Sequence, residues 1–180
     1  MPNKILIASE NPHKQEMLSW IIKDYFEEVI TLSESDIEED CEEEGKSFKE
    51  IAEQKARFFS DKFDGYAIAT DGGIDIPHLE DWDPIHTRRF IQDENINNPD
   101  DFDRMDKLLE MMKEKKGKER EMTWHEAVAL AKNGKILFSK QIEGITGTMQ
   151  RDYDKSKYKE GIWLCSLWYF PQFGKNFFEG

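Results

Sequence analysis

Three polar residues near the start of the chain have the types and spacing needed to hold a phosphate group. Ser9, Asn11 and Lys14 follow an apolar run over residues 4–8 that indicates a strand. Asn11 and Pro12 are a strong helix start, because asparagine caps a helix and proline suits its first position. A lysine in the first turn is unfavourable beside the partly positive N–H groups there, and a bound anion would reverse that effect. The spacing predicts a phosphate site, although a surface lysine after an ordinary cap explains the same residues.

Two more charged residues occupy places suited to chemistry. Lys55 falls within the apolar stripe of a helix that begins after Ser47, where Glu50 completes a capping box. Asp71 follows a buried strand and precedes Gly72, which would let a ligand approach the backbone. We therefore predict that Lys55 reaches out of the core toward a partner and that Asp71 is a functional carboxylate. The alternatives are a lysine that extends into solvent and a turn aspartate that accepts its own backbone hydrogen bonds.

The elements that must position these residues alternate between strand and helix, which is typical of an α/β fold. An Asn133-Gly134 pair between two strand-like runs predicts a tight hairpin. The pattern predicts helices over about 12–25, 47–59 and 99–114, strands over 4–9, 29–32, 66–70, 124–130 and 135–145, an exposed acidic loop over 33–46, and one more buried strand within 163–170.

The composition predicts a single folded domain over the 180 residues, since 38% are hydrophobic and 12% aromatic. No long apolar run or signal sequence is visible, so we expect a soluble, cytoplasmic protein that does not bind membranes. The formal net charge of −13 argues against a nucleic-acid polymer as partner, but not against a small phosphate ligand bound with a divalent metal. Cys41 and Cys165 are isolated, which predicts neither a zinc site nor a disulfide scaffold.

Four blocks of this sequence together resemble the inosine triphosphate pyrophosphatase family, whose members hydrolyse non-standard purine nucleoside triphosphates. Residues 7–14 (IASENPHK) are similar to its (T/S)xNxxK segment, and residues 43–56 (EEGKSFKEIAEQKA) to its ExGx(T/S)FxENAxxKA segment. Residues 69–74 (ATDGGI) correspond to its ADDSGL strand end, and residues 87–90 (TRRF) to its SAR(F/Y) motif. The resemblance extends over about residues 1–150, and the second block is its most specific part.

The resemblance implies an elongated α/β fold in which helices flank a long, twisted mixed sheet and a cleft separates two lobes. It also implies a homodimer and a metal-dependent reaction that uses Mg²⁺, with Mn²⁺ as an alternative. Carried over by motif position, the family's site residues become Ser9, Asn11, Lys14, Lys55 and Gly72 for the triphosphate, Glu43, Glu50 and Asp71 for the metal, Asp71 and Lys55 for catalysis, and Arg89 for the substrate cleft.

The chain departs from the family pattern beside the expected metal site and near its C-terminus. Thr70 replaces the first acid of the strand-end pair, and Ile51 replaces an asparagine. The family's GFGYDPxF segment should fall near residues 161–166, where only the glycine is kept, and its Ser-His-Arg base-recognition motif is absent. Trp163 could stack on a nucleobase instead, although aromatic residues at strand spacing more often belong to a core.

We interpret the chain as a metal-dependent nucleoside triphosphate pyrophosphatase that converts an NTP or dNTP, whether non-standard or modified, to the monophosphate and pyrophosphate. Two alternatives stay open at this point. One is a catalytically silent nucleotide-binding protein of the same fold, which the changes at Thr70 and Ile51 favour. The other is a Maf-type nucleotide pyrophosphatase, whose phosphate segment also begins Ala-Ser.

Overall fold

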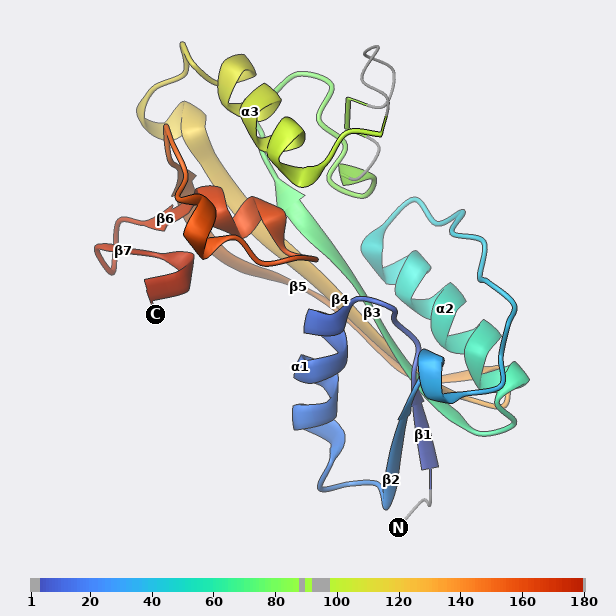
Figure 1. The fold of residues 1–180 in the computed structure, drawn as a ribbon. Coiled ribbons are helices and arrows are strands. Elements are labelled where there is room, and N and C mark those ends of the chain that lie inside the picture. The colour runs from blue at the N-terminus through green and yellow to red at the C-terminus, as the bar shows by residue number, and fades with distance from the viewer. Residues whose placement is uncertain (1–3, 88–89, 92–97, 180) are drawn as a thin grey trace. The chain divides into compact units, whose positions relative to one another are not determined.

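The structure is a computed structural model that describes residues 4–87, 90–91 and 98–179. Seven strands form one sheet in the order β2-β1-β3-β4-β5-β6-β7 (Figure 1). The chain divides into two compact units, of which unit 1 comprises residues 1–72 and 125–142 and unit 2 comprises residues 73–124 and 143–180. The pairing of β1 with β2 and β3 is parallel, whereas β5, β6 and β7 pair antiparallel. The predicted mixed sheet of an α/β protein is confirmed.

The three helices and the first five strands agree in type and approximate place with the hydrophobic pattern, whereas the short strand β7 was not predicted. Unit 1 holds the amino-terminal elements, and the hairpin strands contribute to both units. The bounds are β1 (Lys4–Ile7), α1 (Pro12–Ile22), β2 (Glu28–Thr31), α2 (Phe48–Lys62), β3 (Tyr66–Asp75), α3 (Asp101–Met111), β4 (Glu121–Lys132), β5 (Lys135–Met149), β6 (Trp168–Phe170) and β7 (Lys175–Asn176).

In unit 1, α1 and α2 cover opposite faces of the sheet (Figure 1). Below α1, Leu18 and Ile22 pack with Ile5, Ile7 and Ile68 of the two central strands. Side chains alternate between the two faces along a strand, so Leu6, Ala67 and Ala69, which adjoin these isoleucines in the chain, face the other way. The buried stripe of α2 supplies the apolar side chains for that second face: Phe48, Ile51, Ala52, Ala56 and Phe59.

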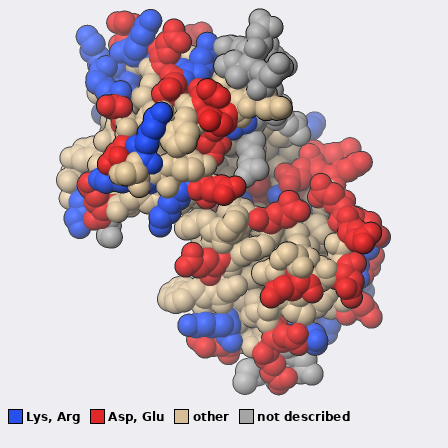
Figure 2. Space-filling view, viewed as in Figure 1, with Lys and Arg blue, Asp and Glu red and all other residues tan. Residues whose placement is uncertain are grey.

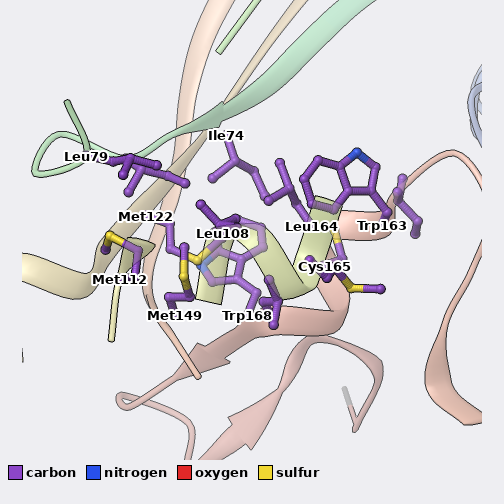
Figure 3. Packing of buried hydrophobic residues seen from close by; sticks show 14 of the residues in the cluster. Ile74, Leu79, Leu108, Met112, Met122, Met149, Trp163, Leu164, Cys165 and Trp168 are labelled. Carbon is purple, nitrogen blue, oxygen red and sulfur yellow. The ribbon is translucent and has the colours of Figure 1, made fainter. Parts of the chain in front are cut away.

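Unit 2 has its own core (Figure 3). Helix α3 and the C-terminal segment pack there against the parts of β3, β4 and β5 that belong to this unit. Trp168 is 1% exposed there, and its ring stacks on Phe177 at 5.8 Å. The prediction of one strand within 163–170 is only partly right. Residues Trp163–Leu167 form a 3₁₀ helix, and β6 begins at Trp168. The short helix buries all five of its residues against this core, which an edge strand with one solvated face would not do.

Most element boundaries differ from the predicted ones by a few residues, and the difference in β3 concerns the candidate site. Helix α1 ends at Ile22, three residues before the predicted end. Strand β3 does not end before Asp71 but continues to Asp75. The pairing of β3 with β1 ends at Ile68, which is opposite Ile7. One further hydrogen bond joins the two segments there, from the amide of Ala8 to the carbonyl oxygen of Ile68. Asp71 therefore lies beyond the last paired residue of β3 on the β1 side, where helix side chains can reach it.

The hairpin turn between β4 and β5 is confirmed. Asn133 and Gly134 both have positive φ, 48° and 74°, as a two-residue type I′ turn requires. The amide of Gly134 donates to the hydroxyl of Ser60 at 3.0 Å, and the side chain of Asn133 donates to Asp64 at 2.8 Å. The turn is thus anchored to the end of α2 and to the loop that follows it.

The surface of unit 1 is strongly acidic. In Figure 2, acidic side chains gather over α2 and over the loop that precedes it, which contains Glu38, Glu39, Asp40, Glu42, Glu43 and Glu44. Such a surface repels polyanions at long range. In the part of the chain that the structure describes, no helix is long and apolar enough to cross a membrane.

Candidate functional site

The N-terminus of α1 has the cap that the sequence predicts. The side-chain oxygen of Asn11 accepts hydrogen bonds from the amides of His13 at 3.0 Å and Lys14 at 3.4 Å. The hydroxyl of Ser9 accepts one from the amide of Asn11 at 3.2 Å. These residues therefore shape the turn from β1 into α1, and the turn directs Lys14 toward β3.

Lys14 and Lys55 converge on Asp71 from two different helices. The Nζ atom of each lysine lies 3.7 Å from the same carboxylate oxygen of Asp71. Lys14 also donates to the carbonyl oxygen of Thr70 at 3.4 Å, and Lys55 contacts Glu43 at 2.6 Å. The side chains of Lys14, Lys55 and Asp71 are 16%, 18% and 13% exposed, so this group is largely withdrawn from water.

The local folding of α2 explains why Lys55 points inward. Lys55 lies on the same helix face as Ile51 and Ala52, both almost fully buried, because residues three and four apart are neighbours on a helix. Its long side chain runs along this apolar stripe and brings the ammonium group to the edge of β3. The prediction that Lys55 reaches a partner rather than open solvent is therefore confirmed, and the partners are Glu43 and Asp71.

Burial and charge act in opposite directions on Asp71. Burial raises the pKa of its carboxyl group, and the nearby carboxylate of Glu43 raises it further, whereas the two lysines and the amide of Gly72 lower it. The net direction is upward, so the ionised form is harder to keep here than in water. Two ammonium groups and two carboxylates together carry no net charge, so this group of four by itself attracts a polyphosphate only weakly.

The predicted metal ligands are brought together only in part. Glu43 and Asp71 contact the same ammonium group of Lys55. Glu50 instead completes the N-terminal cap of α2, where its amide donates to the hydroxyl of Ser47 and its carboxylate accepts from the amide of Lys46 at 2.7 Å. Among the described residues, no three His, Cys, Asp or Glu side chains are grouped so that they could hold a metal ion.

A carboxylate pair still fits Mg²⁺ that arrives with a nucleotide. In such sites Mg²⁺ keeps several waters and takes one or two protein carboxylates together with phosphate oxygens. Glu43 and Asp71 are of this kind, and both are close to lysines that could bind the phosphates. The fit therefore holds for Glu43 and Asp71 and does not extend to Glu50.

Gly72 has a neighbour that the sequence analysis did not single out. A side chain at position 72 would collide with the carboxylate of Glu126 and with the carbonyl oxygen of His125, both on the neighbouring strand β4. The position thus needs glycine because another strand approaches closely. The sequence did carry a signal: Glu126 shares its face of β4 with Val128 and is charged on an otherwise apolar face.

Two predicted site residues remain, Trp163 and Arg89. Trp163 is 5% exposed and belongs to the hydrophobic core of unit 2, where Figure 3 shows it beside Leu164 and Cys165. Stacking on a nucleobase would require its ring to leave that core. Arg89 lies outside the described residues.

Comparisons with known proteins agree on one family. The model of the Ham1 family matches residues 5–165. The chain is 32% identical over 177 residues to a dITP/XTP pyrophosphatase of Thermoanaerobacter sp. (strain X514), covering 98% of this chain and 84% of that protein. It is 26% identical over 189 residues to a dITP/XTP pyrophosphatase of Clostridium perfringens (strain 13 / Type A), covering 98% and 85%.

Solved structures show the same fold. A HAM1 protein from Coxiella burnetii matches with a TM-score of 0.79 at 24% identity, covering 99% of this chain and 87% of that one. The Staphylococcus aureus Ham1 protein matches with a TM-score of 0.77 at 22% identity, covering 99% and 86%. At these identities the likeness concerns the fold alone.

Proposed function

Because the chain belongs to the Ham1 family, we propose that it is a nucleoside triphosphate pyrophosphatase whose active site is the group formed by Lys14, Lys55, Asp71 and Glu43. The observation that carries this proposal is the convergence of two lysines from separate helices on one buried carboxylate. The relatives named dITP/XTP pyrophosphatase support the reaction class. Lone surface ion pairs contribute little to stability, so a partly buried group of this kind is better explained by a charged ligand.

In the proposed reaction, a water oxygen attacks the α-phosphorus of the nucleotide and pyrophosphate leaves. Lys14 and Lys55 bind phosphate oxygens and stabilise the negative charge that develops as the bridging bond breaks. Asp71 orients the attacking water and accepts its proton, for which the raised pKa of its carboxyl group makes it a better base than an exposed aspartate. The products are a nucleoside monophosphate and pyrophosphate.

We propose that the reaction depends on Mg²⁺, with Mn²⁺ as a substitute, held by Glu43 and Asp71. When bound, the ion neutralises phosphate charge and polarises the phosphorus centre. The charges of the four side chains support this proposal. Two lysines already paired with two carboxylates cannot alone offset the charge of a triphosphate, so a further cation is needed.

Purified protein supplied with Mg²⁺ is expected to release pyrophosphate, and no orthophosphate, from at least one member of a panel that contains ITP, XTP, dITP, dUTP and ATP. The relatives' names make dITP and XTP the first substrates to examine. Removing the metal with EDTA should abolish release, and adding Mg²⁺ or Mn²⁺ in excess should restore it. Nucleotide binding in a thermal-shift assay without release from any member would contradict the proposal and favour a silent binding protein.

We also propose that the protein forms a homodimer through β5. Phe138 and Ile142 alternate on one face of this strand and are each 51% exposed. The ladder from β5 to β6 includes only Thr148 and Met149, which leaves a long stretch of strand edge without that partner. An exposed apolar strand edge is suited to pairing with a second copy.

Light scattering is expected to give twice the chain mass of 21.2 kDa for the wild-type protein and the monomer mass for Phe138→Lys. The added charge would have to be buried in the interface, which explains the dissociation. Lys140→Ala, between the two apolar residues, serves as the control and should remain dimeric. A monomeric wild-type protein would disprove the dimer without affecting the proposed reaction.

A further inference from the structure

Unit 2 contains a hollow of about 440 Å³ outside its core. Thr148, Tyr169 and Asn176 line this hollow and are neighbours across β5, β6 and β7, where Tyr169 pairs with both of the others. Trp168 and Phe170, on either side of Tyr169 in the chain, are buried in the core. Because side chains alternate along a strand, Tyr169 and its two neighbours point to the opposite face. The volume is in the range of sites that bind small molecules.

Arg120 lies in the wall of this hollow and is 4% exposed. Its guanidinium group donates hydrogen bonds to three backbone carbonyls, those of Met149 at 2.9 Å, Gln150 at 2.6 Å and Met112. Met112 directly follows α3, so the side chain joins the end of this helix to the end of β5. These contacts fix the guanidinium group in place. The group has five N–H donors, more than the three carbonyls use, so donors remain for a ligand.

Arg151 is a second arginine in the same wall, and its side chain is exposed. It donates to the carbonyls of Lys113 at 3.1 Å and Lys115 at 3.3 Å, in the segment that follows α3. Burial lowers the pKa of Arg120, and the positive charge of Arg151 lowers it further. Backbone carbonyls thus hold two guanidinium groups near each other despite their mutual repulsion.

The charges of these two arginines are not neutralised. In the part of the chain that the structure describes, no carboxylate forms an ion pair with either of them. Their carbonyl partners accept hydrogen bonds but carry no net charge, and arginine is rarely buried without a charged partner. The surroundings add positive charge, since five of the eight residues over 113–120 are Lys or Arg. Figure 2 shows blue side chains gathered over this end of unit 2, so an otherwise acidic protein attracts small anions here.

We propose that this hollow binds a small anion with a diphosphate group, either free pyrophosphate or the diphosphate of a nucleotide. One guanidinium group binds one phosphate through two parallel hydrogen bonds, so two such groups suit two linked phosphates. The hydroxyl of Thr148 and the amide of Asn176 can donate to further phosphate oxygens. All residues that line the hollow belong to unit 2, whereas the four residues of the proposed active site belong to unit 1. The inference therefore does not rest on the proposed function.

Titration calorimetry with pyrophosphate in the presence of EDTA tests the proposal, because the proposed active-site group attracts a polyphosphate only weakly without a metal. The wild-type protein should bind pyrophosphate, and it should bind inorganic phosphate at least about tenfold more weakly. Arg151→Gln is expected to raise the Kd for pyrophosphate about 10- to 100-fold, the usual effect of losing hydrogen bonds to a charged group. ADP distinguishes the two sources of the diphosphate: an affinity equal to that of pyrophosphate indicates a nucleotide, and much weaker binding indicates the free anion.

Two variants serve as controls. Lys118→Gln removes the same charge from an exposed residue that does not line the hollow, and it should change the Kd by about twofold at most. Lys55→Gln alters the proposed active site and should leave this Kd unchanged. Arg151 is exposed, so its variant should remain folded, which thermal unfolding checks.

Three results would overturn the inference. The first is a wild-type protein that does not bind pyrophosphate, or binds phosphate equally well. The second is an equal loss of affinity in Lys118→Gln and Arg151→Gln, which would mean that only the general positive charge matters. The third is a loss confined to Lys55→Gln, which would assign the binding to the proposed active site. None of these results bears on the release of pyrophosphate from nucleotides.

Discussion

Asp71→Asn is expected to lower kcat for pyrophosphate release by roughly 10²- to 10⁴-fold, the usual loss for a group that handles the proton of the attacking water. The amide keeps the size of the side chain but can neither accept that proton nor offer an anionic ligand to a metal. The nucleotide should still bind, because Lys14 and Lys55 remain. Both lysines contact one carboxylate oxygen of Asp71, and without that negative charge they are freer to bind phosphate. Steady-state assays with the best substrate of the wild-type enzyme measure the effect.

The same substitution is expected to leave the melting temperature unchanged or slightly higher. Burial is the largest influence on the pKa of Asp71 and raises it, which means that the ionised group costs folding free energy. A neutral amide removes that cost. Asp75→Asn, four residues further along β3, is the control and should retain wild-type kcat. A fully active Asp71→Asn enzyme would remove this carboxylate from the mechanism.

Trp168→Ala is expected to destabilise the protein by about 3–5 kcal/mol, as for other large core side chains. The indole is 1% exposed and packs against Trp124, Phe170 and Phe177, with ring centroids 4.7 to 6.3 Å away. Gly147 adds to this packing, since a side chain there would collide with the ring nitrogen of Trp168. Thermal unfolding monitored by circular dichroism should show a melting temperature lower by on the order of 10 °C.

Trp20→Ala is the matched control for this prediction. Trp20 lies on α1 and is 72% exposed, so truncating it should change the stability by less than about 0.5 kcal/mol. Equal losses in the two variants would mean that the core of unit 2 does not depend on Trp168. A large loss in Trp168→Ala alone would also support a packing role for the C-terminal aromatic residues, rather than a role in binding a nucleobase.

Local chemistry explains the elements that sequence reasoning predicted well. Asn11 and Pro12 start α1, Ser47 and Glu50 start α2, and the positive φ angles of Asn133 and Gly134 close the hairpin. Each of these signals depends on a few neighbouring residues, so it can be recognised without knowing the rest of the fold. The resemblance to nucleoside triphosphate pyrophosphatases, which depends on short motifs, is confirmed by the match to the Ham1 family.

Other features depend on contacts between distant parts of the chain. Strand β3 continues past Asp71 because it is paired with β4. The residues near Asp71 give no sequence signal for this pairing. The segment Trp163–Leu167 is apolar like a buried strand but forms a 3₁₀ helix, and all five of its residues are buried. In both cases tertiary packing overrides a local pattern.

The residue types of the candidate site could be read from the chain before any coordinates, because a helix cap, an inward lysine and a carboxylate after a buried strand each have a local signature. That Lys14 and Lys55 share one oxygen of Asp71 is decided only by the packing of α1 and α2 on the two faces of the sheet. The approach of Glu126 to Gly72 is of the same kind, since residues 54 positions apart meet only when two strands pair. Sequence periodicity assigns each side chain to a face of its own element, but only the folded chain determines which faces meet.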